Sequence, residues 1–250
     1  MKLFYLYYHF FLINLVFSKS INPNKLKTVN SQQPLKIEVM IESLCPDCMN
    51  FIESSFKNYH NLPGNSVMAS VSLIPFGNAQ EKLVNHKWEF NCQHGENECY
   101  GNTIQACAIK KFDNKKSNDF LICSYNKISS FSSNFDQTTK HCLPNSVDHN
   151  NVLECAKNYE GNNFQHEFAL KTPKEHTYVP WVLINGVHDK EKEKKVIDNL
   201  NKFICDHNNN RQIFQACNGI DNKYSWEKFN MNNFDYTFVE KYCKNTFLNR

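Results

Sequence analysis

The chain has 250 residues, of which 41% are hydrophobic and 21% are charged, so it holds enough apolar side chains to fold and is not disordered throughout. Its 28 basic and 25 acidic residues nearly balance at a net charge of +3, which argues against a nucleic-acid-binding protein. The 11 cysteines are many for this length, and their meaning depends on the redox compartment.

The N-terminus has the pattern of a secretory signal peptide. Lys2 precedes an apolar run over residues 3–17, and small and polar residues follow it. The run is shorter than the roughly 20 residues that cross a bilayer, and His9 and Asn14 interrupt it. We therefore expect a signal peptide over residues 1–20. Its cleavage releases a chain that is not bound to a membrane and that can form disulfides.

The first folded part is predicted over residues 35–76. Residues 35–43 alternate apolar and polar side chains as a strand does, and residues 67–76 predict a second strand. Between them, apolar residues at spacings of three and four predict a helix that ends at a Pro-Gly pair. Because a helical crossover returns the chain in parallel, this is a βαβ unit. A CxxC motif, Cys45 to Cys48, lies where the first strand meets the helix.

Residues 77–174 carry no comparable strand pattern, and apolar side chains at helical spacing predict a helical, cysteine-rich insertion. Residues 175–205 are expected to complete the first part. A third strand is predicted over residues 178–184, with Pro180 inside it and an Asn-Gly turn after it. The charged run over residues 189–195 predicts the solvent-exposed face of a final helix.

The CxxC motif has a specific chemical logic. Cys45 falls at the start of the predicted helix, where free backbone N–H groups stabilise a thiolate, although the charge of Asp47 opposes this. Cys48 lies one turn later and can attack the mixed disulfide that Cys45 forms with a substrate. The alternatives are a structural disulfide and half of a zinc site. A zinc site is disfavoured because the sequence has no second CxxC and no paired histidine motif that would complete it. We interpret the pair as redox-active, which requires Cys45 and Cys48 near solvent and Pro180 beside them.

Pro180 supports this interpretation because a proline in a strand indicates backbone that pairs with something other than the sheet. In thioredoxin-like folds a cis-proline beside the CxxC presents its neighbour's backbone to an incoming peptide, and Val179 and Pro180 resemble that element. An ordinary trans-proline on an edge strand is the alternative. The predicted fold class is therefore α/β, a thioredoxin-like fold with a large disulfide-stapled helical insertion, as in DsbA-type oxidoreductases.

The insertion opens with a spaced motif that resembles the signature of the gamma-interferon-inducible lysosomal thiol reductase family. The matching positions are Cys92, Gln93, His94, Gly95, Glu98, Cys99, Asn102 and Cys107. The resemblance continues at Trp88, at Cys155 and in the segment YVPWVLING, and it covers residues 35–217. It implies a lumenal enzyme that reduces protein disulfides at acidic pH, with Cys45 as the nucleophile and Cys48 as the resolving thiol. No cofactor is expected, and a small thiol or a protein would supply the electrons.

Nine of the cysteines lie outside the CxxC motif. The candidates for structural disulfides are Cys92, Cys99, Cys107, Cys123, Cys142, Cys155, Cys205 and Cys217. If Cys99 and Cys107 share a helix, about 12 Å of rise separates them, too far for a disulfide between them, and their partners stay open. Cys243 is left over in the predicted tail, residues 206–250, and could link two chains. For His94 and Glu98 a hydrogen-bonding role in the stapled loop is favoured over catalysis.

Zinc ligation by Cys92, His94, Cys99 and Cys107 is disfavoured, and no metal is expected. At about pH 5 roughly one unperturbed cysteine in three thousand is ionised, so acid catalysis needs more thiolate stabilisation than a helix terminus supplies. We expect hydrogen bonds from Cys48 and from backbone N–H groups to provide it.

The rival functions are a DsbA-type disulfide oxidase or isomerase, and a secreted non-catalytic thioredoxin-fold binding protein with a permanent disulfide in place of the active dithiol. Disulfide-containing proteins are the expected partners of the enzyme. The chain has no N-x-S/T sequon that could carry a sorting N-glycan. The expected location is therefore the secretory pathway, ending either in the lysosomal or endosomal lumen or outside the cell.

Overall fold

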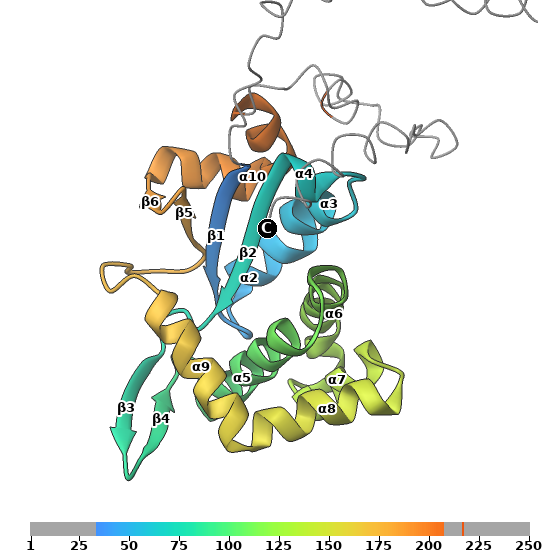
Figure 1. The fold of residues 1–250 in the computed structure, drawn as a ribbon, viewed down its shortest axis with the longest axis vertical. Coiled ribbons are helices and arrows are strands. Elements are labelled where there is room, and N and C mark those ends of the chain that lie inside the picture. The colour runs from blue at the N-terminus through green and yellow to red at the C-terminus, as the bar shows by residue number, and fades with distance from the viewer. Residues whose placement is uncertain (1–33, 208–216, 218–250) are drawn as a thin grey trace, which may run out of the picture. The chain divides into compact units, whose positions relative to one another are not determined.

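The computed structural model describes residues 34–207 and residue 217, so the predicted signal peptide and Cys243 lie outside the described residues. Within residues 34–207, a four-stranded sheet has the strand order β2-β1-β5-β6 (Figure 1). Its strands are β1 (Leu35–Ile41), β2 (Ala69–Pro75), β5 (Trp181–Ile184) and β6 (Val187–His188). β1 pairs in parallel with β2 and antiparallel with β5, and β5 pairs antiparallel with β6.

The central strand β1 is buried on both faces. Ile37, Val39, Met40 and Ile41 have no solvent exposure, and successive side chains of a strand point to opposite faces. The order β1, helix, β2, antiparallel β5 and β6, and a last helix is the thioredoxin-like arrangement, with helices inserted between β2 and β5. The predicted fold class is confirmed. No helix among the described residues is long and apolar enough to span a bilayer.

The segment after β1 is helical in three connected pieces. These are α2 (Pro46–Phe51), a π-helical turn η2 (Ile52–Phe56) and α3 (Lys57–His60). A short helix α4 (Asn65–Met68) then precedes β2. The predicted start of the second strand at residue 67 is therefore wrong, because Val67 and Met68 complete a helical turn that begins after Gly64, which has a φ of +75°.

The last helix, α10 (Lys190–His207), has a kink that the regular apolar stripe did not reveal. Asn199 has non-helical backbone angles. The hydroxyl of Ser55, from η2, donates to the Val196 carbonyl (2.9 Å) and accepts from the Leu200 N–H (2.8 Å). These two backbone groups are the ones that an uninterrupted helix would pair with each other, so an inserted side chain explains the kink. The same hydroxyl joins α10 to the helical segment that carries the CxxC motif.

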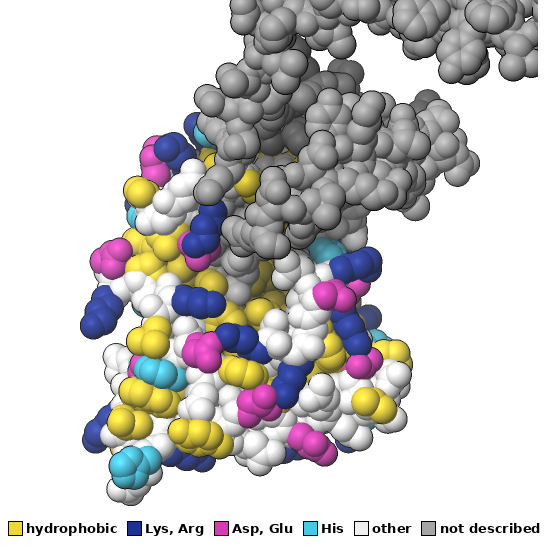
Figure 2. Space-filling model, in the orientation of Figure 1, with side chains coloured by type: hydrophobic (Ala, Val, Ile, Leu, Met, Phe, Trp, Pro, Cys, Tyr) yellow, Lys and Arg dark blue, Asp and Glu magenta, His cyan; other side chains and the backbone are white. Residues whose placement is uncertain are grey.

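The insertion consists largely of helices, as predicted. The helices are α5 (Glu96–Lys111), α6 (Asn114–Lys127), a 3₁₀ turn η3 (Ile128–Phe131), α7 (Phe135–Cys142), α8 (Ser146–Lys157) and α9 (Tyr159–Lys171). Figure 1 shows them gathered at the end of the sheet where β1 and β2 finish. On the face shown in Figure 2, acidic and basic side chains are interspersed.

The prediction that residues 77–174 lack strands is wrong. Strands β3 (Gln80–Val84) and β4 (Lys87–Asn91) form an antiparallel hairpin whose turn residues, Asn85 and His86, have positive φ angles. The hairpin packs against α9, because the Trp88 ring stacks on His166 at 3.8 Å between centroids. The strands are short, most of their residues are exposed, and their turn has no glycine, so the usual hairpin signals are weak.

Disulfides hold the insertion together. In the described part of the chain the pairs are Cys92–Cys99, Cys107–Cys155, Cys123–Cys142 and Cys205–Cys217. The second joins α5 to α8, and the third joins α6 to α7. All eight cysteines proposed as structural are paired, and neither Cys99 nor Cys107 bonds to the other.

Removing the Cys107–Cys155 disulfide should destabilise the chain more than removing Cys123–Cys142. The first pair spans 48 residues and the second spans 19, so loop-closure entropy predicts losses of about 4 and about 3 kcal/mol. The free energies of unfolding of the two double-serine variants can be compared by urea denaturation. Equal losses, or a larger loss for Cys123→Ser/Cys142→Ser, would contradict this order.

Candidate active site

The CxxC motif occupies the N-terminus of α2. Cys45 is the N-cap residue, in extended conformation, and Pro46 takes the first helical position, where no N–H is needed. The Cys45 sulfur accepts a hydrogen bond from the Cys48 N–H at 3.2 Å. Glu42 precedes this turn, and its carbonyl accepts the Cys45 N–H at 3.4 Å. The local geometry therefore aims a helix terminus at the Cys45 sulfur, as the sequence predicts.

The two sulfurs differ in acidity. The thiol hydrogen bond from Cys48 does most to lower the pKa of Cys45, helped by the backbone N–H groups of Cys48 and Asp47, against burial and the charge of Glu42. Burial, followed by the same thiol hydrogen bond, raises the pKa of Cys48 well above its usual value. Cys45 is thus the more acidic of the two thiols. The carboxylate that most opposes ionisation of Cys45 is Glu42 and not Asp47.

Both sulfurs are more enclosed than the sequence analysis required. Cys45 keeps 6% of its surface exposed and Cys48 keeps none. Both cysteines are buried, so the expectation that Cys45 and Cys48 lie near solvent is wrong. Cys48 is buried because it lies on the inner side of α2, in the hydrophobic core. A reagent approaching from solvent meets Cys45 first.

The loop before β5 lies against Cys45. The Val179–Pro180 peptide bond is cis, as expected, and the Cys45 thiol lies 3.8 Å from the Val179 carbonyl oxygen. Pro180 does not lie inside a strand, because β5 begins at Trp181, so that part of the prediction is wrong. A groove of about 410 Å³ opens between this loop, α2 and Ile197 of α10. The structure thus brings Val179 and Pro180 to the same side of the molecule as Cys45.

Glu193, a residue of α10, fixes the loop that carries Val179 and Pro180. Its side chain accepts hydrogen bonds from the Tyr178 hydroxyl (2.6 Å) and from the Val182 N–H (2.8 Å), on either side of Val179 and Pro180. Burial, together with the bond to Glu193, raises the pKa of Tyr178 to about 12. Glu193 is only 4% exposed, so the prediction that the whole charged run faces solvent is wrong at this residue. The hydrogen bonds from the Tyr178 hydroxyl and the Val182 N–H satisfy both oxygens of the carboxylate, which explains why it can be buried here.

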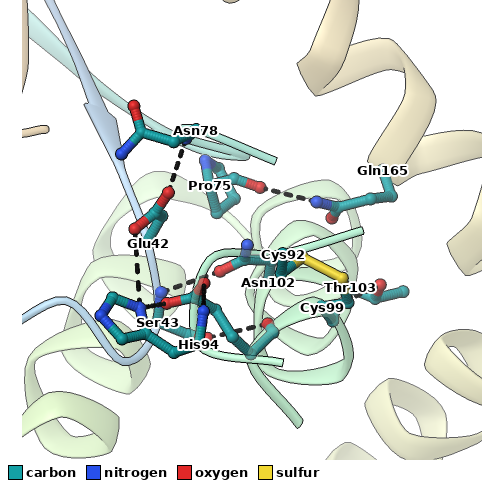
Figure 3. Close-up of a disulfide and its surroundings, with 11 residues drawn as sticks. Glu42, Ser43, Pro75, Asn78, Cys92, His94, Cys99, Asn102, Thr103 and Gln165 are labelled. Atoms are coloured by element: carbon teal, nitrogen blue, oxygen red, sulfur yellow. Dashed lines mark hydrogen bonds and ion pairs between the residues drawn. A yellow bond between two sulfur atoms is a disulfide. The ribbon is translucent and has the colours of Figure 1, made fainter. Parts of the chain in front are cut away.

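The spaced motif at the start of the insertion, Cys92 to Cys107, lies against the residues that precede the CxxC turn (Figure 3). The Ser43 N–H donates to the Asn102 side chain at 2.8 Å, and the Ser43 hydroxyl donates to the Glu98 carbonyl at 3.0 Å. Glu98 also accepts the His94 N–H at 3.0 Å, and its carboxylate lies 2.6 Å from the His94 ring nitrogen Nδ1. His94 and Glu98 therefore have the hydrogen-bonding arrangement expected of the stapled loop.

Glu42 is the residue of this site that the sequence analysis missed. Its side chain is fully buried at the end of β1, where it accepts the Asn78 N–H at 2.5 Å and lies 3.9 Å from the His94 ring nitrogen. Burial, followed by the charge of Glu98, raises its pKa to about 7. The one available signal was a carboxylate directly after the apolar run of a predicted central strand, three residues before the first cysteine of the CxxC motif.

Replacing Cys48 by alanine should raise the pKa of Cys45. The substitution removes the thiol donor that contributes most to the lowered pKa, so the Cys45 thiolate should persist to more acidic pH in the wild type than in the variant. The measurement is the rate of iodoacetamide labelling at Cys45 against pH, with mass spectrometry to locate the label. A midpoint that is the same in Cys48→Ala as in the wild type would count against this assignment.

Replacing Glu193 by glutamine should weaken the loop that precedes β5. The two donors bond to different carboxylate oxygens, and glutamine replaces one of these oxygens by an NH2 group that cannot accept, so we expect a loss of about 1–3 kcal/mol in unfolding free energy. Hydrogen exchange at Val182 should also accelerate. Glu191→Gln, an exposed change on the same helix, is the matched control. The idea is wrong if the two variants behave alike.

Known proteins are similar to this chain over about two thirds of its length. The model of the family described as Gamma interferon inducible lysosomal thiol reductase (GILT) matches residues 36–159. Proteins named gamma-interferon-inducible lysosomal thiol reductase from Carassius auratus and Mus musculus are each 32% identical over 179 residues, covering 69% of this chain and 68% and 67% of theirs.

More distant similarities were also found. GILT-like protein 1 of Drosophila melanogaster is 28% identical over 195 residues, covering 72% of this chain and 77% of its own. A crystal structure of Pseudomonas aeruginosa DsbA covers 68% of this chain and 84% of its own, with 14% identity and a TM-score of 0.43. On the family model and the relatives at 32% identity, the chain belongs to the gamma-interferon-inducible lysosomal thiol reductase family.

Proposed function

We propose that this chain is a thiol-disulfide oxidoreductase that reduces disulfide bonds in proteins, with Cys45 as the nucleophile and Cys48 as the resolving thiol. The observation that carries the proposal is the unequal pair itself: a sulfur with a lowered pKa at a helix terminus, hydrogen-bonded by a buried thiol. The relatives named thiol reductases support the reaction class. In the described part of the chain only Cys45 and Cys48 are free thiols, which disfavours the rival with a permanent disulfide.

The reaction needs two exchanges. The Cys45 thiolate attacks one sulfur of a substrate disulfide, and the other substrate sulfur leaves as a thiolate that takes a proton. Cys48 then gives up its proton and attacks the Cys45 sulfur of the mixed disulfide, which releases the second substrate thiol. The protein ends with a Cys45–Cys48 disulfide. Two molecules of a small thiol, or one protein dithiol, supply two electrons and two protons, leave as a disulfide and return Cys45 and Cys48 to their reduced form.

The order of these steps follows from the electrostatics of the pair. Cys48 holds its proton partly because it hydrogen-bonds to the Cys45 sulfur and feels its negative charge. Once Cys45 is bonded to a substrate sulfur, that charge is gone, and loss of the Cys48 proton becomes easier. The resolving thiolate therefore forms when there is a mixed disulfide to attack.

The groove beside Cys45 gives the substrate a place to bind. Val179 and Pro180 form one wall, and the Val179 carbonyl faces the reacting sulfur. An extended peptide that pairs with the backbone of this loop would bring its own disulfide to Cys45. Because Cys45 is 6% exposed, the approaching segment must be narrow or must widen the groove.

An acidic lumen of the secretory pathway is the proposed working environment. The lowered pKa of Cys45 keeps more of it ionised in acid than an ordinary thiol. The predicted signal peptide would deliver the chain to that pathway, and the relatives named lysosomal support the acidic end of it. A DsbA-type oxidase or isomerase would use the same residues and differ in reduction potential.

The test is the reduction of a protein substrate whose fluorescence is quenched by a disulfide, at acidic and at neutral pH. The wild type should restore fluorescence at both, Cys45→Ser should not, and Cys48→Ser should accumulate a mixed disulfide with the substrate. Cys243→Ser, a cysteine change outside the proposed site, is the control and should react like the wild type. The proposal is wrong if the wild type restores fluorescence no faster than Cys45→Ser.

A further inference from the structure

Two carboxylates and an imidazole converge beside the CxxC turn (Figure 3). Glu42, His94 and Glu98 each direct one possible ligand atom to a common point, and these atoms lie within 4.8 Å of one another. Among the described residues this is the one group of three or more such side chains with that geometry. Glu42 and Glu98 are fully buried, whereas the His94 side chain is 40% exposed and borders solvent.

One atom of this cluster lacks the partner that its burial demands. Glu42 Oε2 is buried and has no hydrogen-bond partner among the described residues. The ring nitrogen of His94, at 3.9 Å, is beyond hydrogen-bond range. A buried carboxylate oxygen without a partner is costly, and a second carboxylate, Glu98, lies in the same cluster. A positive charge at the common point would satisfy this oxygen and balance both carboxylates.

The two carboxylates are already oriented for such a charge. In each, Oε1 accepts a backbone N–H, from Asn78 to Glu42 at 2.5 Å and from His94 to Glu98 at 3.0 Å. In each, Oε2 is the oxygen that faces the His94 ring nitrogen. The Cys92–Cys99 disulfide closes the loop that carries His94. Backbone donors and a covalent link thus hold one oxygen of each carboxylate in place. The other oxygen has no hydrogen-bond partner in Glu42 and pairs with the His94 ring nitrogen in Glu98, where a metal would take the place of the shared proton.

We propose that Glu42, His94 and Glu98 bind a divalent transition-metal cation, with Zn²⁺ the best fit to one nitrogen and two oxygen donors. Zinc bonds of about 2.0–2.2 Å in a tetrahedral site separate neighbouring ligand atoms by about 3.3–3.5 Å. The His94 ring nitrogen lies 2.6 Å from Glu98 Oε2 and 3.9 Å from Glu42 Oε2, so the present distances bracket that value. Water would take the fourth position through the exposed edge at His94. This inference goes beyond the proposed function and does not depend on it.

The test uses the purified full chain with Cys45 and Cys48 oxidised to a disulfide and any remaining thiol, including Cys243, alkylated. Cysteine can then not compete for metal. Zn²⁺ binding is measured by isothermal titration calorimetry and by the shift in Tm. Co²⁺ is then substituted, because its absorption spectrum reports nitrogen and oxygen ligands and would show a charge-transfer band if sulfur were bound. We expect one equivalent of metal, an increase in Tm and no sulfur band.

Three variants separate this site from other histidines. His94→Gln and Glu42→Gln should each weaken Zn²⁺ binding at least tenfold and remove the Tm shift. His166→Gln is the matched control, because its ring also contacts a carboxylate, that of Glu81 at 2.9 Å, outside the cluster. It should bind like the wild type. Since His94 is partly exposed, its variant should fold even if Glu42→Gln does not, and circular dichroism checks this.

The opposing outcomes are equally definite. An oxidised wild type that takes up no Zn²⁺, or a His94→Gln variant that binds as well as the wild type, overturns the proposal and leaves His94 and Glu98 as a simple hydrogen-bonded pair. Equal loss of binding in His166→Gln and His94→Gln would show uptake by unrelated surface histidines. None of these results bears on the disulfide-reduction assay.

Discussion

The hydrogen bonding between Cys48 and the Cys45 sulfur depends on where the helix α2 begins, and the rest of the structure maintains that starting point. If α2 began one residue later, the Cys45 sulfur would no longer be at the N-cap and the Cys48 sulfur would no longer point into the core. The turn is fixed from two sides. On one side, residues of α5 accept hydrogen bonds from the N–H and the hydroxyl of Ser43. On the other side, the Val179 carbonyl of the loop before β5 contacts the Cys45 sulfur.

The helical insertion is therefore part of the site and not an appendage to it. Asn102 and Glu98 hold the segment before Cys45 although they are more than fifty residues away in the chain. α5 approaches this segment closely at Gly101, where a Cβ atom would clash with the Phe135 ring and the Ser43 hydroxyl. The disulfides keep α5 attached to its neighbours, so loosening the insertion would also loosen the turn that carries the reacting sulfur.

Much of this arrangement could be predicted from the sequence, where local pattern and chemistry agree. The βαβ unit and the CxxC at its junction follow from alternation and helix-terminus physics, and the cis bond before Pro180 follows from the resemblance of Val179 and Pro180 to the cis-proline element of thioredoxin-like folds. The β3–β4 hairpin could not be predicted, since packing of Trp88 on His166 supports it more than its own sequence does. Glu193 and Glu42 are acidic residues that the sequence alone would place at the surface, and only the fold reveals the backbone donors beside their buried carboxyl groups.

The proton on Glu42 has a consequence for the conditions under which the fold is most stable. Its pKa is about 7 in the folded chain and near the ordinary 4.5 once the chain unfolds. Between these values the folded state binds a proton that the unfolded state has released, so this group's contribution to stability is complete in acid and declines as the solution becomes neutral. Most carboxylates in proteins act in the opposite sense and favour unfolding in acid. The contribution of Glu42 alone therefore makes the fold around the two thiols more stable in acid than at neutral pH.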